Sequence, residues 1–173
     1  MEQLKERSIN GSFALIKNNE RSLWLQREDN GLLELPGGGS NNNEYHHKMV
    51  LIREIEEETK LKIKQSRLRL YAQLGQRLSP DTSQQFGGIE YGSVFLYYSN
   101  LYESSFEITL SSDHIKYFFL SHSEIIRDWK KFSSGALWMY FTYLKFQETR
   151  EIQEGLLRDR RKWKGKEYLY IGK

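Results

Sequence analysis

The sequence contains no cysteine, only two prolines and no long apolar run. Without cysteine, the chain has no disulfide, no thiolate metal site and no cysteine nucleophile. The longest apolar stretch, "GALWMYFTYL", is well short of the roughly 18 residues that a membrane-spanning helix needs. The amino-terminal "MEQLKERSING" is charged and lacks the apolar core of a signal peptide. We therefore expect a soluble, cytoplasmic protein that is not bound to a membrane.

The composition is that of one globular domain. The chain has 173 residues, of which 38% are hydrophobic and 14% aromatic, enough for a sizeable core. No internal repeat, low-complexity run or linker interrupts it. The formal net charge of +3 permits an anionic partner without requiring one. We expect a single domain over 1–173, with a helical extension at about 134–160.

Strand patterns dominate the first two thirds of the sequence. The segment "GSFALIKNNERSLWLQRED" predicts two strands joined by a turn at 18–20, and "GLLELPGGG" predicts a short strand that leads into a glycine-rich loop. A polar loop, "SPDTSQQFGG", is expected between two later strands. The two strands that flank this loop are predicted at 67–78 and 91–100. Two further strands are predicted at 114–121 and 166–172.

Three helices are expected. No glycine or proline interrupts 46–60, where apolar residues recur at helical spacing. Ser121 or Ser123 would cap a second helix that runs to position 130, and Ser133 or Ser134 would cap a long last helix that ends near position 158. Strands and helices mix without regular alternation, which favours an α+β fold or a mixed α/β sandwich over a doubly wound parallel sheet.

The first predicted helix carries an unusual number of carboxylates. Glu54, Glu57 and Glu58 stand at i, i+3 and i+4 and share one face, away from the apolar positions. Carboxylates side by side repel one another unless they are neutralised. Arg53 can neutralise one of them, and a hard divalent cation such as Mg²⁺ or Mn²⁺ can neutralise two or three. A solvated, charged helix face is the alternative.

The glycines before this helix favour the metal site. Glycine allows close approach of another group to the backbone, and "LPGGG" is followed by a polar spacer and then by the carboxylate helix. This combination resembles the Nudix box, G-x5-E-x7-R-E-U-x-E-E-x-G-U, in which U is aliphatic. The match is clear over 53–61, and "GSFALI", "LWLQRE" and "LELPGG" resemble the strands that precede the box in this family.

The sequence departs from the Nudix box at two places. Counted from Gly38, the first glutamate of the pattern falls at Glu44, but the spacing from Glu44 to Arg53 is one residue too long. Lys60 stands where the pattern has the glycine that ends the helix, and a lysine at a helix C-terminus is electrostatically acceptable. Neither departure touches the three glutamates that would face a metal.

The resemblance implies a fold, an activity and a set of roles. Nudix hydrolases have a mixed sheet sandwiched between helices (α/β/α), and they cleave a nucleoside diphosphate linked to another group with the help of Mg²⁺ or Mn²⁺. The resemblance makes Glu57 and Glu58 metal ligands and Glu54 a third ligand or the base that acts on water. Arg53 would orient a glutamate, and the backbone around Gly38 could bring a carbonyl to the metal.

The resemblance leaves two roles open. In several family members the general base lies outside the box; the candidates here are Glu103, Glu107 and Asp113, with Asp113 favoured by its place in "SSDHIKYFFLS". Each could equally be an ordinary surface acid. Substrate contacts could come from a phosphate partner and from aromatic rings that stack on a base, although a surface ion pair and core packing are the alternatives. These candidates are Arg27, Phe86, Tyr91 and Tyr97.

Two other classes of function compete with the hydrolase. A non-catalytic module with the Nudix fold could bind or sense a nucleotide, although such modules usually lose box glutamates. The basic tail "RDRRKWKGKEYLY" could bind RNA through phosphate contacts and stacking, although a solvated helix end explains it more simply. An apolar stripe on the last helix indicates core packing or, alternatively, a homodimer interface. The stripe consists of Leu137, Tyr140, Phe141 and Leu144.

Overall fold

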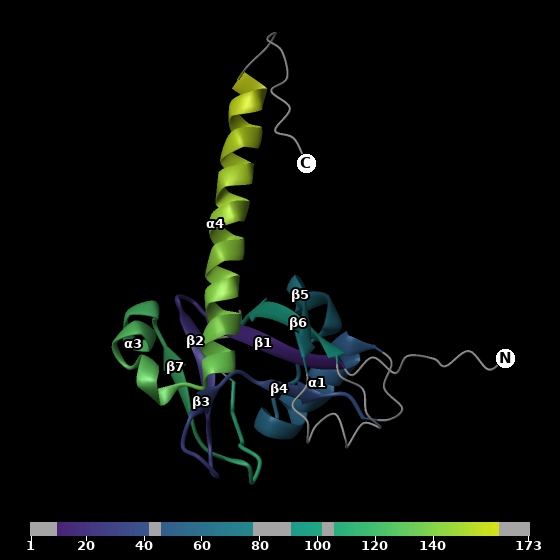
Figure 1. Cartoon of the computed structure of the whole chain (residues 1–173), viewed down its shortest axis with the longest axis vertical. Coiled ribbons are helices and arrows are strands. Elements are labelled where there is room, and N and C mark those ends of the chain that lie inside the picture. The colour runs from purple at the N-terminus through teal and green to yellow at the C-terminus, as the bar shows by residue number, and fades with distance from the viewer. Residues whose placement is uncertain (1–9, 42–45, 78–90, 102–105, 163–173) are drawn as a thin grey trace, which may run out of the picture.

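The computed structural model describes residues 10–41, 46–77, 91–101 and 106–162 (Figure 1). Seven strands form one sheet, and helices lie on both of its faces. The strands are β1 (Asn10–Asn18), β2 (Arg21–Arg27), β3 (Leu33–Glu34), β4 (Gly37–Gly39), β5 (Arg69–Arg77), β6 (Tyr91–Asn100) and β7 (His114–Leu120). The helices are α1 (His47–Thr59), α3 (His122–Arg127) and α4 (Ser134–Lys162), with 3₁₀ turns at Gln65–Arg67 and Trp129–Lys131.

The sheet is mixed, as predicted. Its main path runs β3-β2-β1-β6-β5, with β4 paired to β1 and β7 paired to β2. β1 and β6 run parallel over eight consecutive pairs, from Asn10↔Ser93 to Lys17↔Asn100. The other pairings between described strands are antiparallel. The hairpin of β1 and β2 turns at the predicted position, where Asn19 adopts a left-handed φ of 53°.

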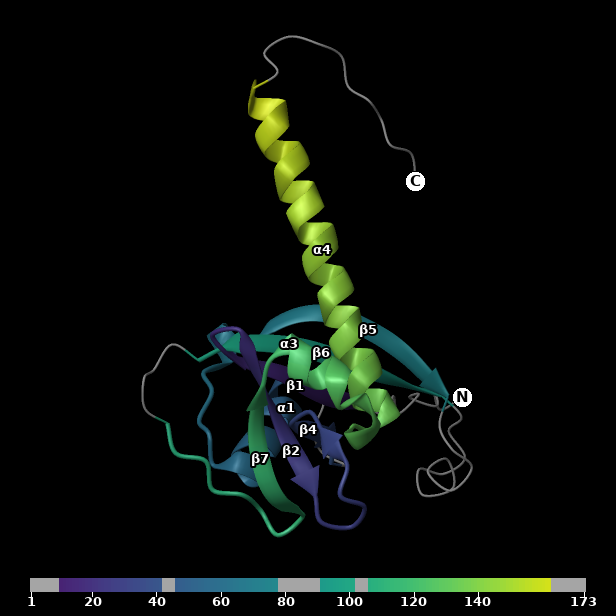
Figure 2. The same cartoon turned by 90° about the vertical axis from the view of Figure 1, so that its left-hand side faces the viewer.

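Successive residues of a strand face opposite sides of the sheet, so the core has two layers, one under the helical layer on each side (Figure 2). Even-numbered residues of β1, such as Ala14 and Ile16, face α1 and pack with its Leu51 and Ile55. On the opposite face, a second cluster packs under α3 and α4. It includes Leu15, Trp24, Leu33, Ile125, Phe132, Tyr140 and Tyr143. This arrangement confirms the predicted sandwich of a mixed sheet between helices.

Helix α1 ends where the sequence departs from the family pattern. Its Val50, Leu51 and Ile55 are buried, while Lys60 at the C-cap adopts a left-handed conformation with φ 59°. The N–H of Lys60 donates to the carbonyl oxygen of Glu56 at 3.0 Å. A left-handed lysine costs about 1 kcal/mol relative to glycine, so this position keeps the backbone geometry of the pattern without its glycine.

The second predicted helix is shorter than expected. Ser121 caps it in a capping box with Glu124, but α3 ends at Arg127 instead of 130. Asp128 adopts φ −107° and ψ 23°, outside the helical region, and its carboxylate pairs with Arg127 and Lys131 on either side. The chain then makes a separate 3₁₀ turn.

Helix α4 begins as predicted and runs four residues past the expected end, to Lys162. The hydroxyl of Ser133 accepts from the N–H of Ala136 at 3.2 Å. The first half of α4 packs on the sheet, and the second half of α4 extends away from the body of the domain (Figures 1 and 2). Of the predicted apolar stripe, Tyr140 is buried and Phe141 is 44% exposed. The strand expected at 166–172 lies outside the described residues.

No helix in the described part of the chain combines the length and apolar character that crossing a membrane would require.

Candidate functional site

The glycine run expected to be a loop is a short strand, β4, that lies against β1. Gly37 pairs with Phe13 and has φ 141°, and a Cβ atom built there would lie 2.2 Å from the carbonyl oxygen of Ser12. Only glycine permits this approach. The N–H of Gly37 points at α1 and donates to Oε2 of Glu58 at 3.0 Å.

The next two glycines meet the other charged residues of α1. A Cβ atom built on Gly38 would lie 2.7 Å from the carboxyl carbon of Glu54, so the backbone and this carboxylate are in close contact. The carbonyl oxygen of Gly39 accepts a hydrogen bond from Nη2 of Arg53 at 3.1 Å. Three consecutive glycines therefore contact three charged side chains of the predicted box. Gly37 and Gly38 have no room for a side chain, whereas a Cβ atom at Gly39 would meet nothing within 4 Å.

Arg53 links two of the predicted metal-facing glutamates. Its Nη1 lies 2.9 Å from Oε1 of Glu54 and 2.9 Å from Oε2 of Glu57. The Glu54 side chain is 17% exposed, whereas that of Glu57 is 59% exposed. This geometry fits the orienting role expected for the guanidinium, since one fork fixes two carboxylates.

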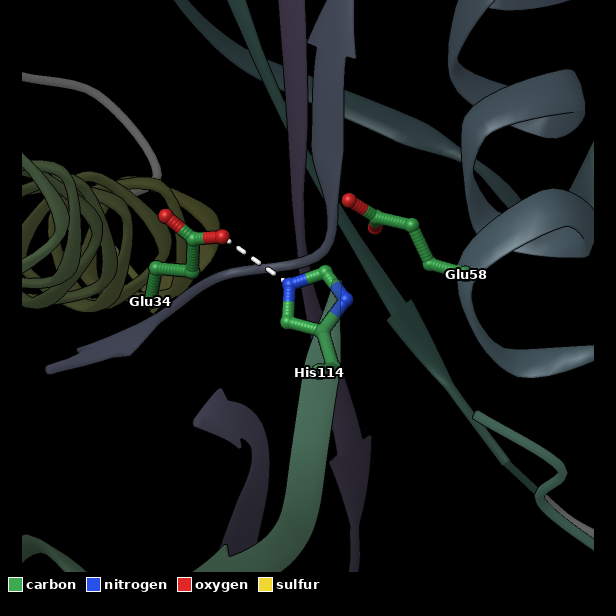
Figure 3. A group of neighbouring side chains, drawn as sticks. All are labelled: Glu34, Glu58 and His114. Carbon is green, nitrogen blue, oxygen red and sulfur yellow. Dashed lines mark hydrogen bonds and ion pairs between the residues drawn. The ribbon is translucent and has the colours of Figure 1, made fainter. Parts of the chain in front are cut away.

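The third glutamate of the helix belongs to a second group of ligand atoms. Carboxylate oxygens of Glu34 and Glu58 and a ring nitrogen of His114 lie within 4.8 Å of one another. Figure 3 shows the two carboxylates approaching the imidazole from opposite sides. Nε2 of His114 is 3.0 Å from Oε1 of Glu34, and its Nδ1 is 3.3 Å from the hydroxyl of Ser111. The three side chains come from β3, α1 and β7.

Burial dominates the electrostatics of the Glu58 carboxyl. It raises the pKa of the Glu58 carboxyl to about 8, against the opposing hydrogen bond from the N–H of Gly37. The hydrogen bond to Glu34 raises the pKa of His114, and burial opposes that rise. Oxygen ligands with one imidazole suit a hard divalent cation such as Mg²⁺ or Mn²⁺. Such a cation would favour the ionised carboxylates that burial disfavours.

The sequence patterns did not predict Glu34 or His114 as site residues, although they did predict residues close to each of them in the chain. Asp113, the candidate base, is exposed, and its backbone carbonyl accepts from the N–H of Glu28 at 2.9 Å. It is His114, one residue further, that faces Glu58. Glu34 stands three residues before Gly37, in "LELPGG". Because the two strands pair with β2 and not with each other, their meeting is a tertiary effect.

Of the other predicted residues, Arg27 borders this group through Glu34, and the rest lie apart from it or outside the described residues. Arg27 makes two hydrogen bonds of 2.8 Å with Asp29 and one of 3.4 Å with Glu34, and these contacts raise its pKa. Glu107 is exposed. The side chains of four candidates lie outside the described part of the chain. They are Glu44, Phe86, Tyr91 and Glu103.

The contact between Gly38 and Glu54 can be tested directly. If the carboxylates of α1 act on a substrate, we expect Gly38→Ala to lower kcat about tenfold or more, because the new methyl group displaces the Glu54 carboxylate and a small misplacement of a reacting group is costly. Stability should change little, since the displaced atoms are the end of a flexible side chain. Gly39→Ala is the matched control, because a Cβ atom there has nothing within 4 Å. Equal rates in the two variants would contradict a role for the contact.

Solved structures share this fold. The MutT protein from Methanosarcina mazei Go1 superposes with a TM-score of 0.59 at 23% identity, over 85% of this chain and 98% of that one. A bifunctional NMN adenylyltransferase/ADP ribose pyrophosphatase from Francisella tularensis, complexed with AMP and a manganese ion, gives 0.60 at 21% identity. That likeness covers 81% of this chain and 42% of the bifunctional enzyme, so this chain spans less than half of it.

A third similar structure is the NUDIX domain of Shewanella oneidensis NrtR, complexed with ADP ribose. It gives a TM-score of 0.58 at 11% identity, over 79% of this chain and 85% of that one. No curated protein matches the chain. Identities this low establish a common fold and leave the substrate of this chain open.

The family model of the NUDIX domain matches residues 9–141, which is most of the chain. This span contains the sheet, β4, the carboxylates of α1 and both Glu34 and His114. On the family match and the shared fold, we conclude that the chain belongs to the Nudix family.

Proposed function

We propose that this protein is a pyrophosphohydrolase that uses Mg²⁺ or Mn²⁺ to cleave the diphosphate linkage of a nucleoside diphosphate joined to another group. The observation that supports this most directly is the contact of β4 with α1, in which three glycines hold Arg53, Glu54 and Glu58 in place. A helix face that served only to be solvated would not need two adjacent glycines without room for a side chain beside it. This close packing of charged residues supports the proposal of a metal site.

Glu57, Glu58 and Glu54 would hold the cation, with the carbonyl of Gly38 as a further oxygen ligand. When bound, the cation neutralises the diphosphate and lowers the pKa of a coordinated water. Arg53 keeps Glu54 and Glu57 aimed at the same region through its two contacts of 2.9 Å. Water attacks phosphorus, its proton passes to a carboxylate, and the bridging P–O bond breaks, with the electron pair leaving on the bridging oxygen.

We assign the proton acceptor to Glu54. It is the more enclosed of the two carboxylates that Arg53 holds, and it lies directly against the backbone of Gly38. Asp113 remains the alternative base outside the box, but it is exposed, and the adjacent His114 occupies the position that faces Glu58. Both assignments predict a rate that falls at acid pH, because the base must be ionised.

The substrate class is a nucleotide. Structures with the same fold hold AMP or ADP ribose, and a further similar structure is a dihydroneopterin triphosphate pyrophosphohydrolase from E. coli. Arg27 lies beside Glu34 at the edge of the Glu34–Glu58–His114 group, and we propose that it contacts a phosphate of the substrate. Phe86 and Tyr91 are proposed to contact the base.

A hydrolysis screen tests the proposal. It would offer nucleoside triphosphates, ADP-ribose, NADH, sugar nucleotides, dinucleoside polyphosphates and capped RNA, each with Mg²⁺ or Mn²⁺, and would measure phosphate and nucleoside monophosphate products. We expect metal-dependent turnover of one class that stops when the metal is chelated. Failure to turn over any of them, together with thermal stabilisation by one ligand, would instead identify a nucleotide-binding module.

A further inference from the structure

Two serine hydroxyls are buried without a hydrogen-bond partner among the described residues: those of Ser12 and Ser99. Ser12 is 0% exposed and Ser99 is 1% exposed. An unsatisfied buried hydroxyl lowers the stability of the folded protein, because it has lost its hydrogen bonds to water. An alanine of nearly the same shape would make the folded protein more stable at either position. Each hydroxyl therefore needs an explanation other than stability.

Ser12 projects toward the carboxylates of α1. It lies on the same face of β1 as Ala14 and Ile16, which pack against α1. Its direct partner across the β1–β4 pair is Gly38. Residues directly opposite in an antiparallel pair project to the same face, with Cβ atoms about 4.5–5.5 Å apart. A Cβ atom built on Gly38 would project in this direction and would lie 2.7–2.9 Å from the carboxylate atoms of Glu54.

We propose that Ser12 is a positioning residue for Glu54. When the site holds its divalent cation, the Ser12 hydroxyl donates to one lone pair of a Glu54 carboxylate oxygen. The other oxygen is left for the cation, and the second lone pair of the first oxygen accepts the proton of the attacking water. The inference deepens the proposed function and rests on it. In the structure Arg53 contacts Oε1 of Glu54 at 2.9 Å, so a second donor on the opposite, buried side would fix the plane of the carboxylate from both sides.

Ser99 provides a matched control. It lies opposite Ile16 in the parallel pair of β1 and β6. Ile16 is four residues along the strand from Ser12, a distance of about 13 Å. Ser99 therefore has the same chemistry and burial as Ser12, but it sits far from Gly38 and Glu54.

The test compares Ser12→Ala with Ser99→Ala in two measurements. Both variants should raise the melting temperature of the metal-free protein, because each removes an unsatisfied hydroxyl. In a titration that follows free Mn²⁺ by its electron paramagnetic resonance signal, Ser12→Ala should weaken Mn²⁺ binding about tenfold, whereas Ser99→Ala should bind as the wild type does. A stabilised protein with weaker metal binding is a pattern that a merely structural serine would not give.

An unchanged Mn²⁺ affinity in Ser12→Ala, or an equal loss in both variants, would overturn the inference while leaving the hydrolase intact. Lack of Mn²⁺ binding and of metal-dependent turnover by the wild-type chain would overturn the proposed function, and this inference with it. The two failures are therefore distinguished by the wild-type titration, which is performed first.

Discussion

Replacing Glu57 with glutamine is expected to lower kcat about a thousandfold, which corresponds to roughly 4 kcal/mol of transition-state stabilisation. The change removes a negative charge from the cation site and keeps the shape of the side chain. The fold should be unaffected, because the Glu57 side chain is 59% exposed and its contact with Arg53 can persist through the amide oxygen. Steady-state kinetics on the substrate found in the screen, with circular dichroism as a check on folding, measures the effect.

Glu56→Gln is the matched control for this experiment. Glu56 is the preceding residue, it is exposed, and its nearest ion pair is a 4.0 Å contact with Lys62. Exposed pairs of this kind contribute about 0–1 kcal/mol, and Glu56 stands at the variable position of the box. We expect a rate within a factor of about two of the wild type, since no transition-state contact is lost. If Glu57→Gln retained the wild-type rate, Glu57 would be removed from the mechanism.

The stability of the metal-free protein is expected to fall as the pH rises from about 5 to about 8. The pKa of the Glu58 carboxyl is raised from 4.5 to about 8, chiefly by burial. Above pH 4.5 the unfolded chain releases this proton while the folded protein keeps it, so deprotonation favours unfolding. The loss should reach about 2–4 kcal/mol and be complete once the pH passes the folded pKa. The raised pKa of His114 acts in the same direction.

Chemical denaturation at pH 6 and at pH 8.5, without metal, measures this slope, and Glu58→Gln isolates its source. Glutamine keeps an acceptor for the N–H of Gly37 but carries no titratable proton, so the variant should lose much less stability across the same interval. Mg²⁺ competes with the proton for Glu58, and its stabilising effect on the wild type should be larger at pH 8.5 than at pH 6. Parallel slopes for wild type and variant would show that Glu58 is not the group responsible.

The helix and its glutamates could be predicted because they are local features. The spacing of Glu54, Glu57 and Glu58 fixes their common face once a helix forms, and the structure has that helix within one residue of the expected bounds. The hairpin turn was likewise predicted, since alternation and turn residues are read over a few positions. The mixed sheet was expected only from the resemblance to the Nudix family.

The residues that surround Glu58 could not be predicted from such local patterns. Glu34 and His114 are 80 residues apart in the chain and meet only because β3 and β7 both pair with β2. The glycine run looked like a loop because its pairing with β1 requires knowledge of which strand lies beside it. The early end of α3 coincides with ion pairs of Asp128 to its chain neighbours Arg127 and Lys131. The first two of these differences arise from tertiary contacts, whereas the end of α3 involves local ones.

The wide sequence separation of these partners also bears on how the protein folds. Contacts between distant residues require the closure of long loops, and chains rich in such contacts fold more slowly than those with local ones. During synthesis on the ribosome, α1 emerges long before β7, and β1 waits for β6, its parallel neighbour. Until His114 has emerged, the nascent chain holds Glu58 without half of its surroundings. The Glu34–Glu58–His114 group is therefore completed only at a late stage of folding.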